Sequence, residues 1–371
     1  MSVPGHAAIR MAAAIGATGD DGPVHLGAPD AGEAEPVGRR LLRLIFGVQG
    51  GAELPEPVAD LAAAPSDPAV FARFEYQVHL VLEASPEVKA VATEMLTRFY
   101  TVEASVGNVQ ALVELGHLLW WDDPGRARAA FEAAIEAGAP RGLLDLALLL
   151  DAVLGDEAAA RGVFQEAIGS ADPDVAAEAL VEFGHLLLSR RDPGALAVFE
   201  RAIATGHREF APAAMIGAGL VRDKVLGDYQ GALAAFQRAA GSGTVQWAAQ
   251  ALIDLGDLLD RHGDTSGAAD AWRRAATSGV GEWASMALNK LANLAHHNDD
   301  LDMANAAHRI AAEAGSPEAS YILLITGHIL ASRGDTARAR EAYRQAIDSG
   351  YTDDDEWVLE FLQSAGHSDQ P

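Results

Sequence analysis

The 371-residue sequence contains no cysteine, only three lysines and few aromatic residues. Without cysteine the chain can form no disulfide, thiolate zinc site or iron–sulfur cluster, and it has no thiol nucleophile. Basic residues number 27 against 53 acidic ones, and the net charge of −26 argues against a nucleic-acid partner, because a phosphate-binding face needs excess Lys and Arg. With aromatics at 6%, the core is expected to consist of Ala, Leu, Val and Ile. This Ala-rich composition predicts an all-α protein.

Long apolar runs are also missing. The most apolar early segment, residues 41–48, is interrupted by Arg43 and falls far short of the ~20 residues that a membrane span needs. Arg10 and the short run of residues 11–17 are too brief for a secretory signal. We therefore expect a cytoplasmic protein without a membrane partner.

The first 106 residues divide into two regions. Residues 1–37 are rich in Gly, Ala, Pro and Asp without an apolar period, which predicts a disordered acidic leader. Residues 38–106 are predicted to be a helical N-terminal region that caps the rest of the chain or forms a degenerate repeat. Residues 39–46 suit a short amphipathic helix, and Gly50-Gly51 and three following prolines break the pattern.

Two helices are predicted in the remainder of that region. Ser66 or Asp67 can cap the first, and Pro68 suits its first turn. Ser85-Pro86 then opens the second, so the two helices form an antiparallel hairpin. The expected apolar face of this second helix consists of Val88, Val91, Met95, Phe99 and Val102.

Beyond residue 108 the sequence repeats itself with a period of about 35 residues, which lies in the range of helical-hairpin repeats. An aromatic residue marks each repeat except the sixth, where a histidine takes its place. The intervals between successive markers are 33, 35, 37, 36, 36 and 35 residues. The markers are Phe131, Phe164, Phe199, Phe236, Trp272, His308 and Tyr343.

Alanine stands four residues before and three residues after every marker, as in Ala268 and Ala275 around Trp272. Residues at these spacings share one helix face. Small residues allow helix backbones to approach closely while the aromatic ring fills the space between them. Gly-Asp pairs nine residues before four of the markers, such as Gly263-Asp264, are typical of the end of one helix and the cap of the next.

This pattern resembles the tetratricopeptide repeat, and the second helix at residues 268–279 is also similar to Sel1-like repeats. The resemblance spans residues 107–350. A hydrophobic–Gly pair precedes four of the markers at the place that the family uses in its first helices: Leu115-Gly116, Phe183-Gly184, Leu255-Gly256 and Thr326-Gly327.

The resemblance implies a right-handed α-solenoid of about seven antiparallel helix-turn-helix repeats, with a concave face lined by the first helices. Such an array needs caps at its ends. Residues 351–371 are expected to supply a C-terminal capping helix and tail, since the acidic residues 353–356 suit a first helical turn and Val358 and Phe361 can cover the last hairpin.

Signatures of catalysis are absent from the sequence. It contains no G-x-S-x-G, no phosphate-binding loop and no H-E-x-x-H. Gly217-Ala218-Gly219 lacks the third glycine of a dinucleotide motif, and adjacent histidines such as His296-His297 do not share a helix face for a metal. We therefore expect no enzyme activity, no cofactor and no metal site.

Carrying the family's groove positions onto this chain selects residues that directly follow the hydrophobic–Gly pair or lie about one turn later. Trp and Arg lead this set because they are common interface anchors. The alternative is that the histidines hydrogen-bond within the helix stack. The candidates are His117, Trp120, Trp121, His185, Asp257, Asp260, Arg261, Asn289, Asn293, His296, His297 and His328.

The function that follows is a non-catalytic adaptor or scaffold that binds a peptide or protein segment in the concave groove. The negative charge favours a basic or Arg-rich partner and salt-sensitive association. The alternative is a regulatory or sensory subunit, in which the N-terminal region carries the effector role and the repeats sense a peptide.

Overall fold

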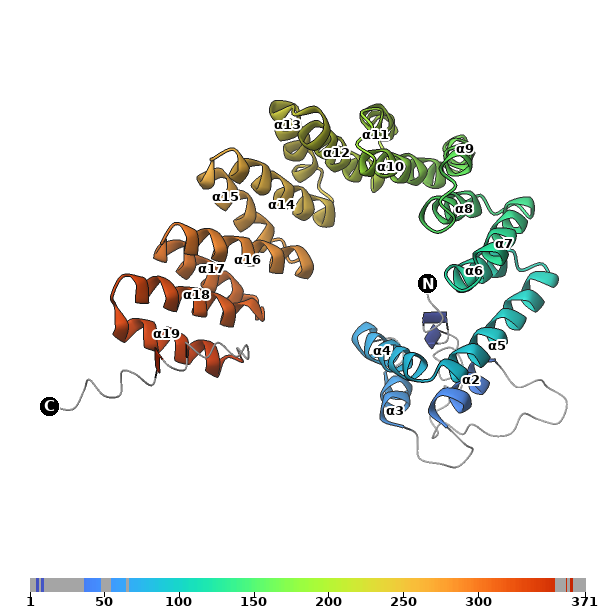
Figure 1. Ribbon diagram of the computed structural model, residues 1–371, viewed down its shortest axis with the longest axis horizontal. Helices are drawn as coiled ribbons and strands as arrows, with labels where there is room; N and C mark the ends of the chain where they lie inside the picture. Colours follow the sequence, from blue (N-terminus) through green and yellow to red (C-terminus); the bar gives the residue numbers. More distant parts are fainter. Residues whose placement is uncertain are drawn as a thin grey trace. The chain divides into compact units, whose positions relative to one another are not determined.

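The computed structural model describes residues 5–6, 8–9, 37–47, 55–64, 67–350, 358 and 361–362. All regular structure in these ranges is helical, which confirms the all-α prediction (Figure 1). The chain divides into two compact units, Met1–Ala176 and Ala177–Pro371, and the division falls within helix α10 (Pro173–Ser189). No helix among the described residues is both long and apolar enough to cross a membrane.

The first unit consists of helices that follow one another along the chain and pack mainly on their sequence neighbours. Helices α4 and α5 form the predicted N-terminal hairpin, and Asp67 caps α4 by accepting hydrogen bonds from the amides of Ala69 and Val70. The helices are α2 (Val37–Phe46), α3 (Glu56–Ala63), α4 (Pro68–Ala84), α5 (Pro86–Ser105), α6 (Gln110–Leu119), α7 (Pro124–Glu136), α8 (Arg141–Ala152) and α9 (Glu157–Ile168).

The second unit continues the alternation of first and second helices. A five-residue π-helix, η1, directly follows α12 and ends at Gly227 in the left-handed conformation. The helices are α11 (Ala195–Ala204), α12 (Phe210–Val221), η1 (Arg222–Leu226), α13 (Tyr229–Ala240), α14 (Val245–Arg261), α15 (Thr265–Ala276), α16 (Gly281–His297), α17 (Leu301–Glu313), α18 (Glu318–Ser332) and α19 (Thr336–Asp348).

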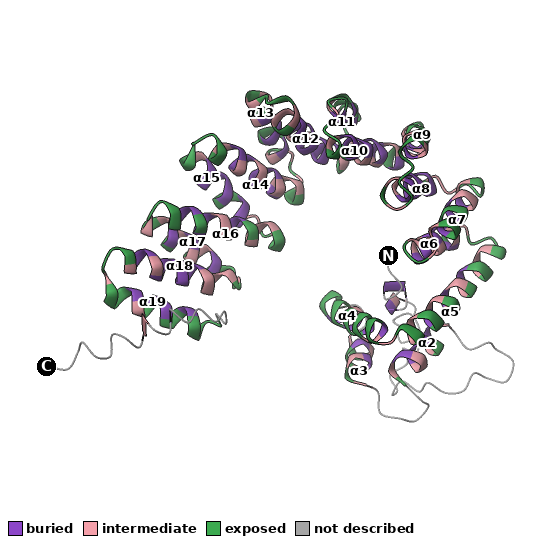
Figure 2. Ribbon diagram, in the orientation of Figure 1, coloured by how far each residue is buried: buried purple, intermediate pink, exposed green. Residues whose placement is uncertain are grey.

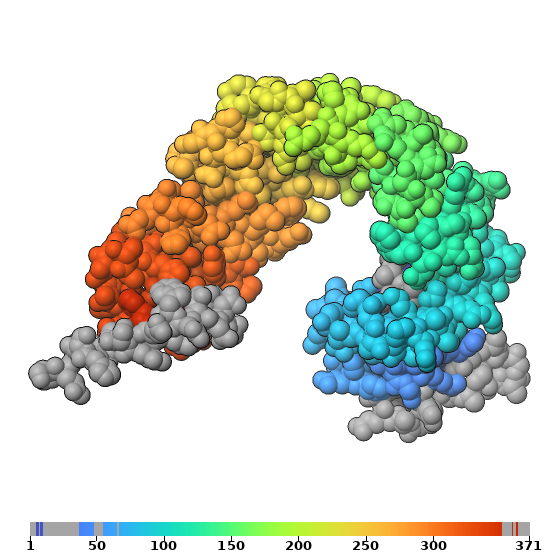
Figure 3. Space-filling model, viewed as in Figure 1, coloured from blue at the N-terminus to red at the C-terminus, as the bar shows by residue number. Residues whose placement is uncertain are grey.

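The repeat markers and their alanines form the core. Each marker lies on a second helix, namely α7, α9, α11, α13, α15, α17 or α19, and all fourteen flanking alanines are 0% exposed. Buried residues line the facing sides of neighbouring helices (Figure 2). In the second unit, side chains fill the spaces between the ribbons of Figure 1 (Figure 3). His308 is the exception among the markers, since it is half-buried and its Nδ1 lies 3.3 Å from the carbonyl oxygen of Ala319.

Glycines in the first helices provide the seats for the aromatic markers. A Cβ at Gly116 would lie 2.3 Å from the Phe131 ring, and one at Gly256 would lie 2.3 Å from Nε1 of Trp272. Any side chain there would displace the ring, so the hydrophobic–Gly pair is a packing device. Gly217 and Gly219 of α12 seat Phe199 and Phe236 in the same way.

The N-terminal region differs from the sequence prediction in three places. Helix α3 forms where prolines were expected to break the pattern, because Pro55 precedes the helix and Pro57 occupies its first turn, where proline fits. Residues 5, 6, 8 and 9 of the predicted disordered leader are helical, and His6 is buried with Nδ1 2.9 Å from Tyr100 Oη. The rest of the leader to residue 36 lies outside the described ranges.

The third difference concerns the face that α5 buries. Ala92, Leu96 and Tyr100 form its core side, whereas Val91 and Val102 are 47% and 60% exposed. Of the predicted face, Val88, Met95 and Phe99 pack partly buried against this core, while Val91 and Val102 do not. Both stripes are apolar, and the core selects the one that places Tyr100 against His6.

Most of the predicted C-terminal capping helix lies outside the described residues, including the acidic run 353–356. Val358 is described and is buried. The Phe361 ring meets Tyr343 edge to face at 5.4 Å, so this part of the segment does cover the last marker.

Candidate functional site

A cleft of about 550 Å³ opens along α14, α15 and α16 in the second unit. Most of its wall comes from the first helices α14 and α16. Five of the predicted groove residues line it: Asp257, Asp260, Arg261, Asn293 and His297. The others in its wall are Thr265, Trp272, Lys290, Leu294 and Asn298.

The floor of this α14–α16 cleft follows from the repeat itself. Trp272 is the marker of its hairpin, and it is held over α14 because Gly256 leaves room for its ring. Asp254, Asp257 and Arg261 occur at intervals of three and four residues, which places them on one side of α14. The Gly256–Trp272 contact and the row of charged residues on α14 therefore lie side by side at the cleft.

Lys290 joins the two walls of the cleft. Its Nζ lies 2.8 Å from Oδ1 of Asp257 and 3.0 Å from Oδ2, and it stands 5.6 Å from the centroid of the Trp272 ring. Both side chains of the ion pair are about one-third exposed. The ammonium is therefore fixed by a carboxylate and an aromatic face together.

The π-helix η1 provides a second anchor at the edge of the cleft. It carries Asp223, which accepts a hydrogen bond of 2.6 Å from Nη2 of Arg261. Asp223 is largely buried, and Arg261 is half exposed. Arg261 is thereby held in place with part of its guanidinium open to solvent.

Asp254 is the most perturbed acid near the cleft. Burial, together with the neighbouring carboxylate of Asp257, raises its pKa to about 6 against the opposing effect of Lys224, Lys290 and Arg261. Its Oδ2 is buried and accepts no hydrogen bond from the part of the chain that the structure describes. This carboxylate is a proton acceptor within the physiological range of pH.

On the α16 side, polar contacts run toward the next repeat. His297 Nδ1 lies 2.7 Å from the carbonyl oxygen of Asn293, and Tyr321 Oη donates to Oδ1 of Asn293 at 3.1 Å. His296 and His328 approach each other with ring centroids 5.6 Å apart, outside the cleft wall. Asn289 is half-buried on α16 and does not line the cleft.

Three of the predicted residues lie in the first unit. Nε2 of His117 is 3.5 Å from Oδ1 of the buried Asp145 on α8, and its ring stacks on Trp120 at 5.9 Å. Trp120 also meets Phe131 edge to face. His117 and Trp120 therefore pack within the helix stack, while Trp121 is 70% exposed.

His185 in the second unit also packs on a marker, because its ring meets Phe199 edge to face at 5.2 Å. Desolvation at this contact lowers the pKa of His185, although part of the side chain remains open to water. His117 therefore packs within the helix stack, whereas His185 contacts its marker from an exposed position.

The His296–Asp300 segment, considered above for metal binding, has a different structural role. Asp299 adopts φ 51° at the place where other repeats have glycine, and Asp300 caps α17 by accepting from the amide of Met303. No group of three or more potential ligands for a metal ion occurs among the described residues.

Comparison with known proteins agrees with this architecture. The tetratricopeptide repeat family model matches residues 122–176, 225–282 and 289–354. The chain carries tetratricopeptide repeats. None of the curated proteins with which the sequence was compared matches it.

Solved structures of tetratricopeptide-repeat and Sel1-like proteins are similar in fold. YrrB, described as a TPR protein with an unusual peptide-binding site, is 23% identical, and the match covers 54% of this chain and 97% of YrrB with a TM-score of 0.34. The protective antigen c5321 of uropathogenic Escherichia coli is 18% identical, and the match covers 88% of this chain and 71% of the antigen, with a TM-score of 0.41. Yeast Tom70 is 14% identical, and the match covers 96% of this chain and 69% of Tom70, with a TM-score of 0.46.

Among the lining residues that sequence reasoning missed, Trp272 and Lys290 matter most for the chemistry of the cleft, and it also missed the neighbouring acids Asp223 and Asp254. Asp254 stands three residues before the predicted Asp257, and this spacing could have revealed it. Lys290 could have been found as the neighbour of Asn289. Trp272 was assigned only to packing, whereas it also forms the floor beneath Lys290.

Proposed function

We propose that this chain is a non-catalytic protein-interaction scaffold that holds an extended, basic segment of a partner in the α14–α16 cleft. Tetratricopeptide repeats support the scaffold role. The observation that carries the finer proposal is the negative charge that no cation balances along α14: the exposed Asp260 lines the cleft and makes no ion pair with any described residue. Asp254 lies behind the cleft wall, and its buried Oδ2 has no hydrogen-bond donor among the described residues.

Arginine is the side chain that suits these acceptors best. Its guanidinium carries five donors, and it can also stack on an aromatic face such as that of Trp272. The existing cations do not satisfy the site, because Arg261 is bound to Asp223 and Lys290 to Asp257. A partner guanidinium at Asp260 would extend this alternation of charges along α14.

The scaffold is prepared for binding before the partner arrives. Gly256 fixes the position of Trp272, and the ion pairs of Lys290 and Arg261 hold both sides of the cleft. Little side-chain entropy is therefore lost on this side of the interface. The extended segment fits a cleft bounded by helices that already have their backbone hydrogen bonds.

The test uses a fluorescent Arg-Ser repeat peptide of about ten residues and a twin with Gln at each Arg, titrated with the full chain. We expect Asp260→Asn and Asp254→Asn each to weaken binding of the Arg peptide about three- to tenfold at low salt. The matched control is Asp302→Asn, which changes an exposed acid on α17 that makes no ion pair with a described residue.

Two results would contradict the proposal. Equal affinity for the Arg peptide and its Gln twin would show that the cleft does not recognise the positive charge of the peptide. An equal loss of affinity in Asp302→Asn and Asp260→Asn would show that only the overall charge matters, and not the cleft.

A further inference from the structure

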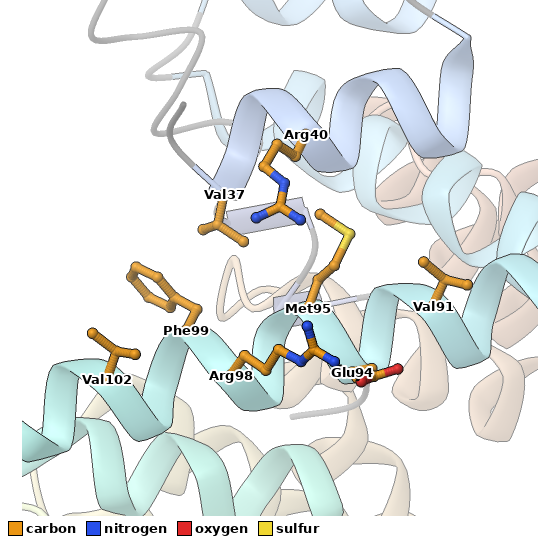
Figure 4. Close-up of a pocket in the computed structure, with 8 residues that line it drawn as sticks. All are labelled: Val37, Arg40, Val91, Glu94, Met95, Arg98, Phe99 and Val102. Atoms are coloured by element: carbon orange, nitrogen blue, oxygen red, sulfur yellow. Dashed lines mark hydrogen bonds and ion pairs between the residues drawn. The ribbon is translucent and has the colours of Figure 1, made fainter. Parts of the chain in front are cut away.

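Helix α5 presents an apolar stripe that the core covers only in part: Met95 and Phe99 are partly buried against the core, whereas Val91 and Val102 are exposed. Val91, Met95, Phe99 and Val102 follow one another at helical spacing, and with Val37 of α2 they line a groove of about 470 Å³ (Figure 4). Val91 and Val102 are 47% and 60% exposed at its ends. Exposed apolar side chains that gather in one groove, rather than singly, indicate a binding surface.

The rim of this α2–α5 groove is basic in a strongly acidic chain. Arg40 extends from α2 toward Met95, and Arg98 stands beside it on α5 (Figure 4). Arg98 pairs with Glu94 one turn earlier, an exposed contact of little energetic weight, whereas Arg40 makes no ion pair with any described residue. Arg40 is thus a cation available to a partner.

Positive charge also continues across α5. A second cavity, of about 760 Å³, lies along α5 and the ends of α6 and α7, and Lys89, Arg98 and Arg126 contribute to its wall. Arg98 belongs to both cavities. Three of the four cations at this surface form ion pairs, Lys89 with Glu83, Arg98 with Glu94 and Arg126 with Asp123, so Arg40 carries the positive charge that no described acid balances.

We propose that the α2–α5 groove binds an acidic amphipathic helix of a partner protein, and that this site is separate from the α14–α16 cleft. The apolar face of that helix packs on Met95 and Phe99, and its carboxylates meet Arg40 and Arg98. A helix is the fitting shape because the stripe follows α5 for 11 residues, or about 16 Å, which equals about three turns of a helix laid beside it.

The probe is a synthetic helical peptide of about 14 residues with Leu at every third or fourth position and Glu on both flanks, together with a twin that has Gln at each Glu. Full chain is titrated into each labelled peptide, and binding is followed by fluorescence anisotropy. We expect the Glu peptide to bind about tenfold more tightly than its Gln twin at low salt, and the difference to shrink as salt is added.

Two pairs of variants test whether the peptide binds in the α2–α5 groove. Val102→Ser weakens the Glu peptide about threefold, while Val245→Ser, a change at a similarly exposed valine of α14, has no effect. Arg40→Gln weakens it about fivefold, while Arg274→Gln, at an exposed arginine of α15, has none. Unchanged melting temperatures for all four variants show that folding is not the cause.

Three results would overturn the proposal. The first is equal affinity for the two peptides, or no binding of the Glu peptide up to about 1 mM. The second is an equal loss of affinity in the variants and their controls. The third is self-association of the chain in sedimentation equilibrium that Val102→Ser abolishes, since the occupant of the groove would then be a second copy.

Discussion

The α14–α16 cleft and the α2–α5 groove are built from the same kind of helix and offer opposite chemistries. The cleft has an aromatic floor and carboxylates along α14, and its cations are already paired. The groove has apolar walls that include Phe99, and an Arg40 at its rim that makes no ion pair with a described residue. The two surfaces thus differ in the residues that line them and not in the kind of secondary structure that carries them.

The largest expected effect concerns the packing that only the cleft depends on. Gly256→Ala places a methyl group against Trp272, and it should cost about 2 kcal/mol of unfolding free energy and abolish binding of the Arg peptide. Binding of the Glu peptide to the groove should persist, because repeats contact mainly their neighbours. Urea unfolding and the two titrations measure both effects.

The control for that change is Gly162→Ala on α9, where a Cβ would meet nothing within 4 Å. It should raise stability by about 0.5–1 kcal/mol, because alanine is the better helix former. If Gly256→Ala behaved like Gly162→Ala, Trp272 would not need its seat and the account of the cleft floor would be wrong.

A second prediction separates the sites by pH. The pKa of Asp254 is about 6 in the folded chain against 3.8 for an unperturbed aspartate, so the folded chain binds more protons between these values and its stability falls as pH rises through them. Asp254→Asn should therefore stabilise the chain by about 1–2 kcal/mol at pH 8, after allowance for partial solvent exposure, and by little at pH 3.

The same titration should affect binding of the Arg peptide and leave the Glu peptide site alone. Protonation of Asp254 below pH 6 removes a charge behind the cleft, so we expect Arg-peptide affinity to fall about threefold between pH 7.5 and pH 5.5. Asp254→Asn should remove that dependence. A pH dependence that remains in the variant would assign it to another group.

The smallest expected effect comes from releasing an existing ion pair. Lys290→Met frees Asp257 and keeps an apolar contact on Trp272, so affinity for the Arg peptide should rise about threefold. The Glu peptide should bind as before. Lower affinity for the Arg peptide would mean that Lys290 itself belongs to the binding surface.

Much of the fold was predictable because the repeat encodes packing locally. The marker and its two alanines define one face of a second helix, and all fourteen alanines are buried. The side of α5 that faces the core was not predictable in this way. Two apolar stripes lie on that helix, and the choice between them depends on residues far away in the sequence, such as His6 beside Tyr100.

The candidate site was predictable only in part for a similar reason. Position relative to the hydrophobic–Gly pair identified Asp257 and Arg261, since these follow from the register of one helix. Their partners lie 33 and 38 residues away, at Lys290 and Asp223. Pairing across that distance depends on how neighbouring helices are aligned, and Asp223 lies on η1, a π-helix that the repeat pattern does not predict.

The close contacts between the first-helix glycines and the aromatic markers also bear on how the chain folds. Gly116 and Phe131 are 15 residues apart, and Gly256 and Trp272 are 16, so the tightest contacts close short loops of the chain. Short loops cost little entropy to close, and chains dominated by local contacts fold quickly. Each hairpin can therefore form soon after its second helix leaves the ribosome, before the rest of the array has been made.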